Sequence, residues 1–184
     1  MGPPSRKNAM KKLFSLVLAL CLLCMALTAC GEKKNDATEL PLIDMIETIY
    51  GDVDAPAYEA VPLDRDNFEY FTFVPYAEGL EACEADALIN ATPHSVVLIH
   101  CADGDVAALA QKVAENANPR KWICTAAEKT QIAYTQHYVL LLMSETNLVD
   151  DMLDNFRALA ADMGEGDVTV LDSAFVDTGV QILG

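Results

Sequence analysis

The stretch "ATPHSVVLIHCADGDVAALAQKVAENANP", residues 91–119, contains a turn, a strand, a second turn and a helix in that order. Its segment "SVVLIHC" is apolar and β-branched, which favours a strand over residues 95–101. One clean apolar stripe then predicts a helix over residues 105–117, capped by Asp103 or Asp105 and ended by "NP". The stripe consists of Val106, Leu109, Ala110, Val113, Ala114 and Ala117.

The turn "ATPH" also joins the strand at 95–101 to an earlier one at 83–90, which predicts a β-hairpin. Gly51 ends an amphipathic helix over residues 40–50, and an acidic loop follows it to residue 66. Ser144 can cap a helix that runs to about residue 161, closed by Gly164. Further strands are predicted at 68–74, 122–125, 129–134, 138–143 and 168–171.

The order hairpin, helix, hairpin, helix predicts an α+β fold. Its antiparallel sheet would have about four to six strands, with the helices mainly on one face. However, "VVLI" and "YVLLLM" do not alternate between apolar and polar residues. Such continuous strands are usually covered on both sides. Either the N-terminal helix covers the second face or the sheet pairs with another subunit, and we favour the helix.

The N-terminal segment has the three parts of a secretory signal peptide. Bases at residues 6, 7, 11 and 12 precede an apolar run, and no acid occurs before Glu32. "LTAC", residues 27–30, resembles the lipobox of bacterial lipoproteins, whose cysteine accepts a diacylglycerol group with acyl chains such as palmitate. We therefore predict a lipoprotein signal peptide at residues 1–29 and lipidation of Cys30. An ordinary signal peptide and an uncleaved anchor are the alternatives, and Met10 is an alternative start to Met1.

The segment after Cys30 is polar, so residues 30–38 are predicted to be the lipidated cysteine and a flexible spacer. Residues 39–184 then suit a single domain with one core. Two acyl chains anchor a protein stably where one does not. We expect the domain to be held at the extracytoplasmic face of the cell membrane through this lipid.

The predicted mature chain is strongly acidic. Removal of the four bases in residues 1–29 leaves 8 Lys and Arg against 28 Asp and Glu, a formal net charge of −20. Such a surface disfavours nucleic acid and anionic lipid head groups as partners. A chain of this length is also small for a two-lobed solute-binding protein.

Three cysteines remain in the predicted domain: Cys83, Cys101 and Cys124. Their spacing matches no zinc or redox pattern. A hairpin centred on Thr92 would place Cys83 opposite Cys101, where a cross-strand disulfide could form. The alternative is that all three are unpaired thiols buried as small apolar groups.

One local anomaly stands out on this acidic chain. "NPRKWICTAAEK", residues 118–129, contains the only tryptophan, Trp122, together with Arg120, Lys121 and Lys129. A guanidinium beside an aromatic ring can bind an anionic small molecule or an envelope protein. The alternative, which we favour, is that Trp122 fills the core and the bases neutralise nearby acids.

The strings "NPRKWIC", "YVLLLMS" and "HSVVLIHC" resemble an uncharacterised family of Gram-positive extracytoplasmic lipoproteins that is described only as a domain of unknown function. The resemblance covers roughly residues 40–161. It implies a tethered α+β domain and supplies no catalytic residue, cofactor or substrate.

Other chemical patterns are weak. Adjacent His100 and Cys101 in a strand point to opposite faces, which argues against a thiol enzyme. Four aspartates could bind calcium, but the loop lacks the glycine and glutamate of an EF-hand, so a solvated acidic loop is preferred. These residues are Asp52, Asp54, Asp64 and Asp66. No metal site or cofactor is predicted, and no hydrolase or nucleotide-binding motif occurs.

Two functions remain open at this point. The first is a non-enzymatic, membrane-tethered module for binding or for envelope assembly. The second is an extracytoplasmic hydrolase or thiol-dependent enzyme. The absence of a recognisable pairing of nucleophile and base favours the first.

Overall fold

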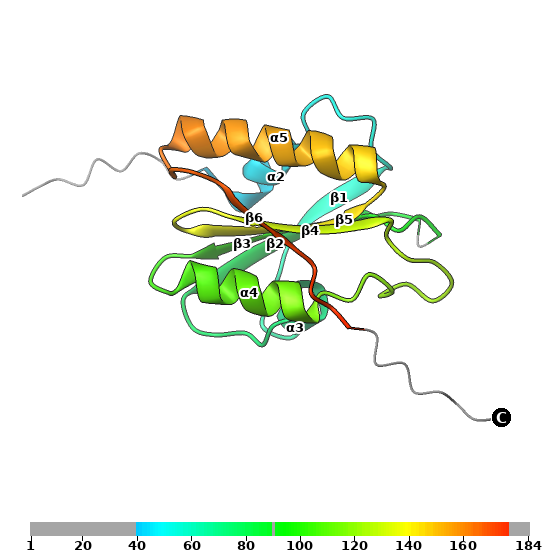
Figure 1. Ribbon diagram of the computed structural model, residues 1–184, viewed down its shortest axis with the longest axis horizontal. Helices are drawn as coiled ribbons and strands as arrows, with labels where there is room; N and C mark the ends of the chain where they lie inside the picture. The colour runs from blue at the N-terminus through cyan, green and yellow to red at the C-terminus, as the bar shows by residue number, and fades with distance from the viewer. Residues whose placement is uncertain (1–39, 90, 177–184) are drawn as a thin grey trace, which may run out of the picture. The chain divides into compact units, whose positions relative to one another are not determined.

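Within residues 40–89 and 91–176, which a computed structural model describes, six strands form one antiparallel sheet in the order β1-β2-β3-β5-β4-β6 (Figure 1). The strands are β1 (Tyr58–Pro62), β2 (Leu80–Ala87), β3 (Ser95–Cys101), β4 (Lys129–Tyr134), β5 (Tyr138–Ser144) and β6 (Thr169–Asp172). The helices are α2 (Leu42–Tyr50), α3 (Phe68–Thr72), α4 (Val106–Asn116) and α5 (Thr146–Met163). The predicted signal peptide, Cys30 and the spacer lie outside the described residues.

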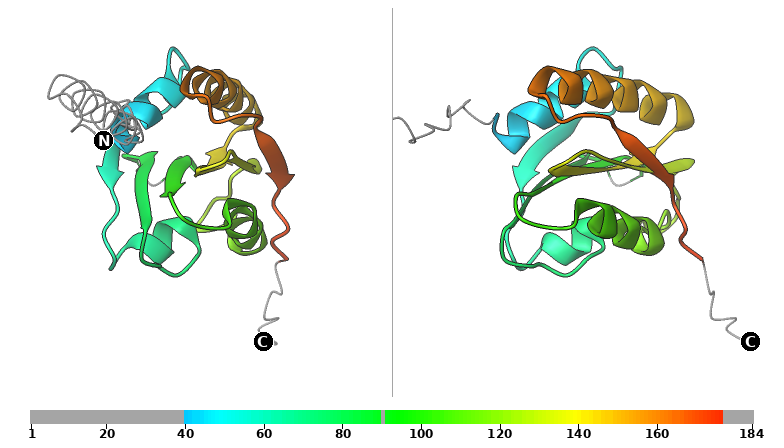
Figure 2. Two further views of the ribbon diagram at one scale, coloured as in Figure 1. Left: turned by 90° about the vertical axis from the view of Figure 1, so that its left-hand side faces the viewer. Right: turned by 60° about the vertical axis from the view of Figure 1, so that its left-hand side comes forward.

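The sheet is covered on both faces, as the apolar runs of β3 and β5 predicted. Val96 and Leu98 pack into a core with α2 and α5, whereas Val97 and Ile99 pack into a second core with α3 and α4. Figures 1 and 2 show the two helical layers on either side of the strands. We call these the α2/α5 face and the α3/α4 face. The α+β class is thus confirmed, and the helices are divided two and two among the described residues rather than gathered mainly on one face.

The predicted strand at 68–74 is wrong, because residues 68–72 form the short helix α3. Phe68 and Thr72 are buried one turn apart, while the intervening Glu69 and Tyr70 face solvent. Phe73 adopts a left-handed conformation with φ of 61° and ends the helix. The aromatic residues that favoured a strand therefore belong to a one-turn helix that packs against the α3/α4 core.

Two smaller differences concern segments near the sheet edges. The predicted loop up to residue 66 contains the edge strand β1, and the predicted strand at 122–125 belongs to an irregular loop. Pro62 stands at the end of β1, a position that a proline tolerates.

The β2–β3 hairpin has a different register from the predicted one. Cys83 pairs with Leu98, and Cys101 pairs with Leu80. The partner of Cys83 is thus shifted from residue 101 to residue 98, an odd number of residues, which places the two cysteines on opposite faces. The physical reason is the turn, since β2 ends at Ala87, whose N–H donates to the carbonyl of His94.

Candidate functional site

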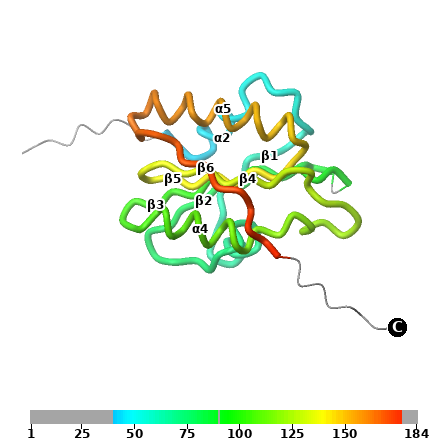
Figure 3. Tube along the Cα trace, in the orientation of Figure 1, coloured from blue at the N-terminus to red at the C-terminus, as the bar shows by residue number. Residues whose placement is uncertain are grey.

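Two loops meet at one end of the sheet and surround a cavity. The cavity has a volume of about 540 Å³ and is lined by residues 70, 91 and 121–125. Tyr70 comes from α3, Ala91 from the β2–β3 connection, and Trp122 and Ile123 from the loop between α4 and β4. Figure 3 shows this connection and this loop side by side at the same end.

The rim of this cavity is unusually apolar for a chain that carries so many acids. The lining residues Ile123 and Tyr70 are 100% and 64% exposed, and Ile89, two residues before Ala91 in the same connection, is 69% exposed. We define the loop-end surface as Tyr70, Ile89, Ala91, Trp122 and Ile123. A cluster of exposed aliphatic and aromatic groups rimmed by polar residues is typical of an interaction site.

Lys121 fastens the loop that carries Trp122 to the sheet. Its ammonium group lies 2.8 Å from a carboxylate oxygen of Asp86 on β2 and 2.9 Å from the hydroxyl oxygen of Ser95 on β3. Only 6% of the Lys121 side chain is exposed. The ammonium also lies 5.2 Å from the centre of the Trp122 ring, within cation–π range. Lys121 is therefore paired inside the protein, as the alternative interpretation of this segment anticipated.

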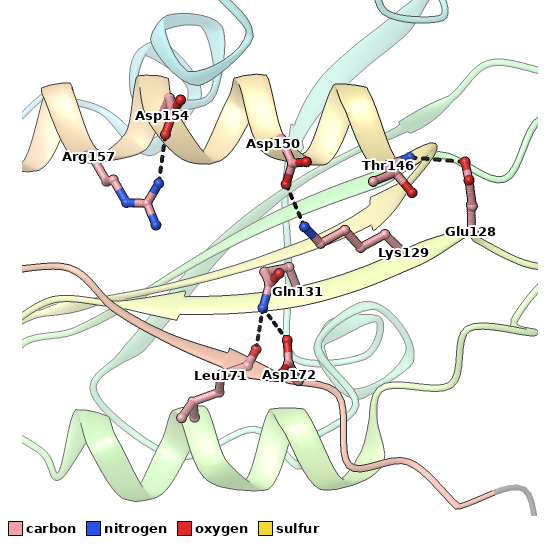
Figure 4. Close-up of polar contacts among 9 residues, drawn as sticks. All are labelled: Glu128, Lys129, Gln131, Thr146, Asp150, Asp154, Arg157, Leu171 and Asp172. Atoms are coloured by element: carbon pink, nitrogen blue, oxygen red, sulfur yellow. Dashed lines mark hydrogen bonds and ion pairs between the residues drawn. The ribbon is translucent and has the colours of Figure 1, made fainter.

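The other bases of the predicted patch lie in different surroundings. Lys129 extends from β4 to Asp150 on α5, which Figure 4 shows. It therefore lies on the α2/α5 face, whereas Ser95 and Lys121 belong to the α3/α4 face. Arg120 is exposed and lines a cavity of about 440 Å³ together with Trp122 and Ile123. The structure thus brings Arg120, Lys121 and Trp122 together and separates Lys129 from them.

Sequence reasoning missed Tyr70 and Ile89 as members of the loop-end surface. The sequence pattern predicts a strand at Tyr70 and places Ile89 inside the first strand of the hairpin. The signal that could have revealed Ile89 is the pair Leu88-Ile89, two aliphatic residues directly before a turn-forming segment, where solvated polar residues are usual.

A buried polar chain connects α2, the β2–β3 connection and β5. The Tyr50 hydroxyl lies 2.7 Å from Nε2 of His94, and Nδ1 of His94 lies 2.8 Å from the Ser144 hydroxyl. Burial lowers the pKa of His94 from 6.5 to about 4 and raises the pKa of Tyr50. His94 is fully buried, so this Ser–His–Tyr chain holds structural elements together and has no contact with solvent.

Cys83, Cys101 and Cys124 are unpaired thiols in the structure, so of the two alternatives the cross-strand Cys83–Cys101 disulfide is not formed. Burial raises the pKa of Cys83 to about 11 and also raises that of Cys101, where Asp103 and Asp105 add to the effect. The thiolate is the reactive form, so both shifts disfavour Cys83 and Cys101 as nucleophiles. Cys124 is exposed, against the prediction that all unpaired thiols are buried.

These environments predict a clear order of alkylation. Iodoacetamide should modify Cys124 of the native protein within minutes, whereas Cys83 and Cys101 should react only after denaturation. Peptide mass spectrometry before and after addition of guanidinium measures both stages. A peptide pair joined through Cys83 and Cys101 in an unreduced digest would contradict this assignment.

The acidic residues form no metal cluster in the part of the chain that the structure describes. Within it, no three His, Cys, Asp or Glu side chains are grouped closely enough to hold a metal ion. Asp64 instead accepts hydrogen bonds from the backbone N–H groups of Asp66 and Asn67, ahead of α3. No helix of residues 40–89 and 91–176 has the length and apolar character needed to cross a bilayer.

Comparison with family models, with curated proteins and with solved structures finds no match to this chain. The family resemblance of the strings around Trp122 and in β3 and β5 therefore stays a prediction.

Proposed function

We propose that the protein is a lipid-anchored, extracytoplasmic binding module, without enzymatic activity, that contacts an envelope protein through the loop-end surface. The observation that carries this proposal is the cavity of about 540 Å³ between Tyr70 and Trp122, beside a fully exposed Ile123. Clusters of Trp, Tyr and aliphatic residues around a pocket are typical of the energetic centres of protein interfaces.

The position of the loop-end surface in the domain supports this proposal. Leu40, the first described residue, precedes Pro41, which lines a cavity together with Pro62 and Cys83 at one end of β1 and β2. The loop-end surface lies beyond the other end, where Tyr58 pairs with Ala87. The described part of the chain therefore begins at the end of the sheet opposite the loop-end surface.

Charge supports a protein partner over a nucleic acid. A formal charge of −20 on the predicted mature chain repels polyanions. The apolar rim offers an aliphatic or aromatic side chain of a partner a desolvated contact. Lys121 holds the loop in place and is not counted among the contacting groups.

A photoreactive amino acid tests this proposal in the producing cell. Installed at position 123 of the full chain, it should give one discrete adduct of higher mass upon illumination. Installed at Asp154, whose side chain is 75% exposed on α5, it should give none. Radiolabelled fatty acid on Cys30, measured in the same cells, checks the anchor separately. Equal labelling patterns at positions 123 and 154 would refute the loop-end surface as the site of contact.

A further inference from the structure

A second cavity lies at the end of the sheet where the described chain begins. Its volume is about 550 Å³, and it is lined by residues 41–43, 62–65, 76 and 80–83. This volume is in the range of small-molecule sites in proteins. The cavity lies beside the C-terminal end of β1. It therefore borders residues 80–82 of β2, which extend beyond Cys83, the last β2 residue that pairs with β1.

The walls and the rim of this cavity differ in polarity. Leu42, Ile43, Leu63 and Leu80 are half-buried, and they give the walls a predominantly aliphatic surface. The rim carries exposed charged groups instead. The Arg65 guanidinium lies over the ring of Tyr76 at 4.8 Å from its centre, a cation–π contact that holds it at the edge.

Two acids limit what the rim can bind. Asp64 and Glu81 also line the cavity, so Arg65 offers one favourable contact to an anion and does not form an anion cage. Oδ1 of Asp64 is already occupied by the N–H groups of Asp66 and Asn67. A ligand would therefore gain most of its affinity from an apolar part buried inside the cavity.

The location of the cavity points to the source of that ligand. Pro41, in the cavity wall, follows Cys30 by 11 residues. An extended chain of this length spans at most about 40 Å. A lipid on Cys30 would thus keep the aliphatic cavity within this distance of a bilayer, where acyl chains are the most abundant apolar ligands.

We propose that this cavity binds one acyl chain of a zwitterionic phospholipid, with the head group at the Arg65–Tyr76 rim. This inference rests on the lipid anchor of the proposed function and is independent of the loop-end surface. It assigns the two ends of the sheet to different tasks, lipid contact near the tether and protein contact at the far end.

The test uses the full lipidated chain reconstituted in phosphatidylcholine vesicles in which a fraction of the phosphatidylcholine carries a photoactivatable diazirine in its acyl chain. After illumination, mass spectrometry should find labelled peptides at residues 41–43, 62–65 and 80–83. A carboxylate in the wall, Leu63→Glu, should reduce this labelling at least about tenfold, because a buried charge opposes an apolar ligand. The matched control Leu88→Glu, at an exposed leucine beyond the other end of β2, should leave it unchanged.

Folding and anchoring are measured in the same samples. Circular dichroism reports whether Leu63→Glu is folded. If it is not, Arg65→Gln is compared with Arg157→Gln, an exposed arginine on α5, and only the former should lower the labelling several-fold. Wild-type protein that floats with the vesicles but is labelled elsewhere, or equally in Leu63→Glu, overturns the cavity proposal alone. Protein without lipid on Cys30 overturns both the anchor and this inference.

Discussion

Replacement of Lys121 by methionine should lower the free energy of unfolding by about 3 kcal/mol, near the lower bound for breaking a buried ion pair. The Lys121 side chain is almost fully buried against Asp86, so its loss leaves a carboxylate without its cation. Because 27% of the Asp86 side chain stays exposed to water, we expect the loss of stability to lie at this lower bound. Urea unfolding at neutral pH measures the difference.

Lys129→Met is the matched control for this substitution. Its partner Asp150 is 55% exposed, and exposed ion pairs contribute about 0–1 kcal/mol. The double variant Lys121→Met with Asp86→Leu should recover most of the lost stability, since it removes the unpaired charge. Equal destabilisation by Lys121→Met and Lys129→Met would show that the contact with Asp86 does not fasten the loop.

Acidification from pH 7 to pH 4 should destabilise the protein through His94. The folded state keeps this histidine neutral down to a pKa of about 4, while the unfolded chain binds a proton near pH 6.5. Between these values the unfolded state holds more protons, so stability is lost as the pH falls through this window. A difference of about 2.5 pKa units corresponds to about 3 kcal/mol. Below pH 4 the contribution of His94 no longer changes.

The variant His94→Gln separates this contribution from those of the carboxyl groups. An amide can bond to Tyr50 and Ser144 as the imidazole does, and it does not titrate. Burial raises the pKa of Glu84, which acts in the opposite direction and is common to both proteins. Urea midpoints measured across this pH range should fall more steeply for wild type than for the variant. Parallel curves would contradict the role of His94.

Local patterns predicted the parts of the fold that local physics controls. The apolar stripe of residues 105–117 gave α4, and the unbroken apolar runs gave β3 and β5 with cover on both faces. The strand predicted for "FEYFTFV" was wrong because a one-turn helix is too short to show a helical period. Its aromatic residues are also typical of strands.

The rest depends on contacts between residues far apart in the sequence. Lys121 meets Asp86 across 35 positions, and His94 meets Ser144 across 50. Nothing in the composition around these residues specifies such partners. The predicted register of the hairpin was wrong for a related reason. The length of the turn determines which residues lie opposite each other, and the sequence does not reveal that length.

Every residue of β5 is buried, because the strand has neighbours on both edges and helices on both faces. In a strand with one solvent-exposed face, every second side chain can be polar. In β5 no side chain faces solvent. A polar side chain in place of any residue from Val139 to Met143 would therefore lie inside one of the two cores, where it would cost free energy unless it found a hydrogen-bond partner. The loops at the ends of the sheet differ from β5, because they contain positions such as Ile123 at which a polar side chain would stay in contact with water.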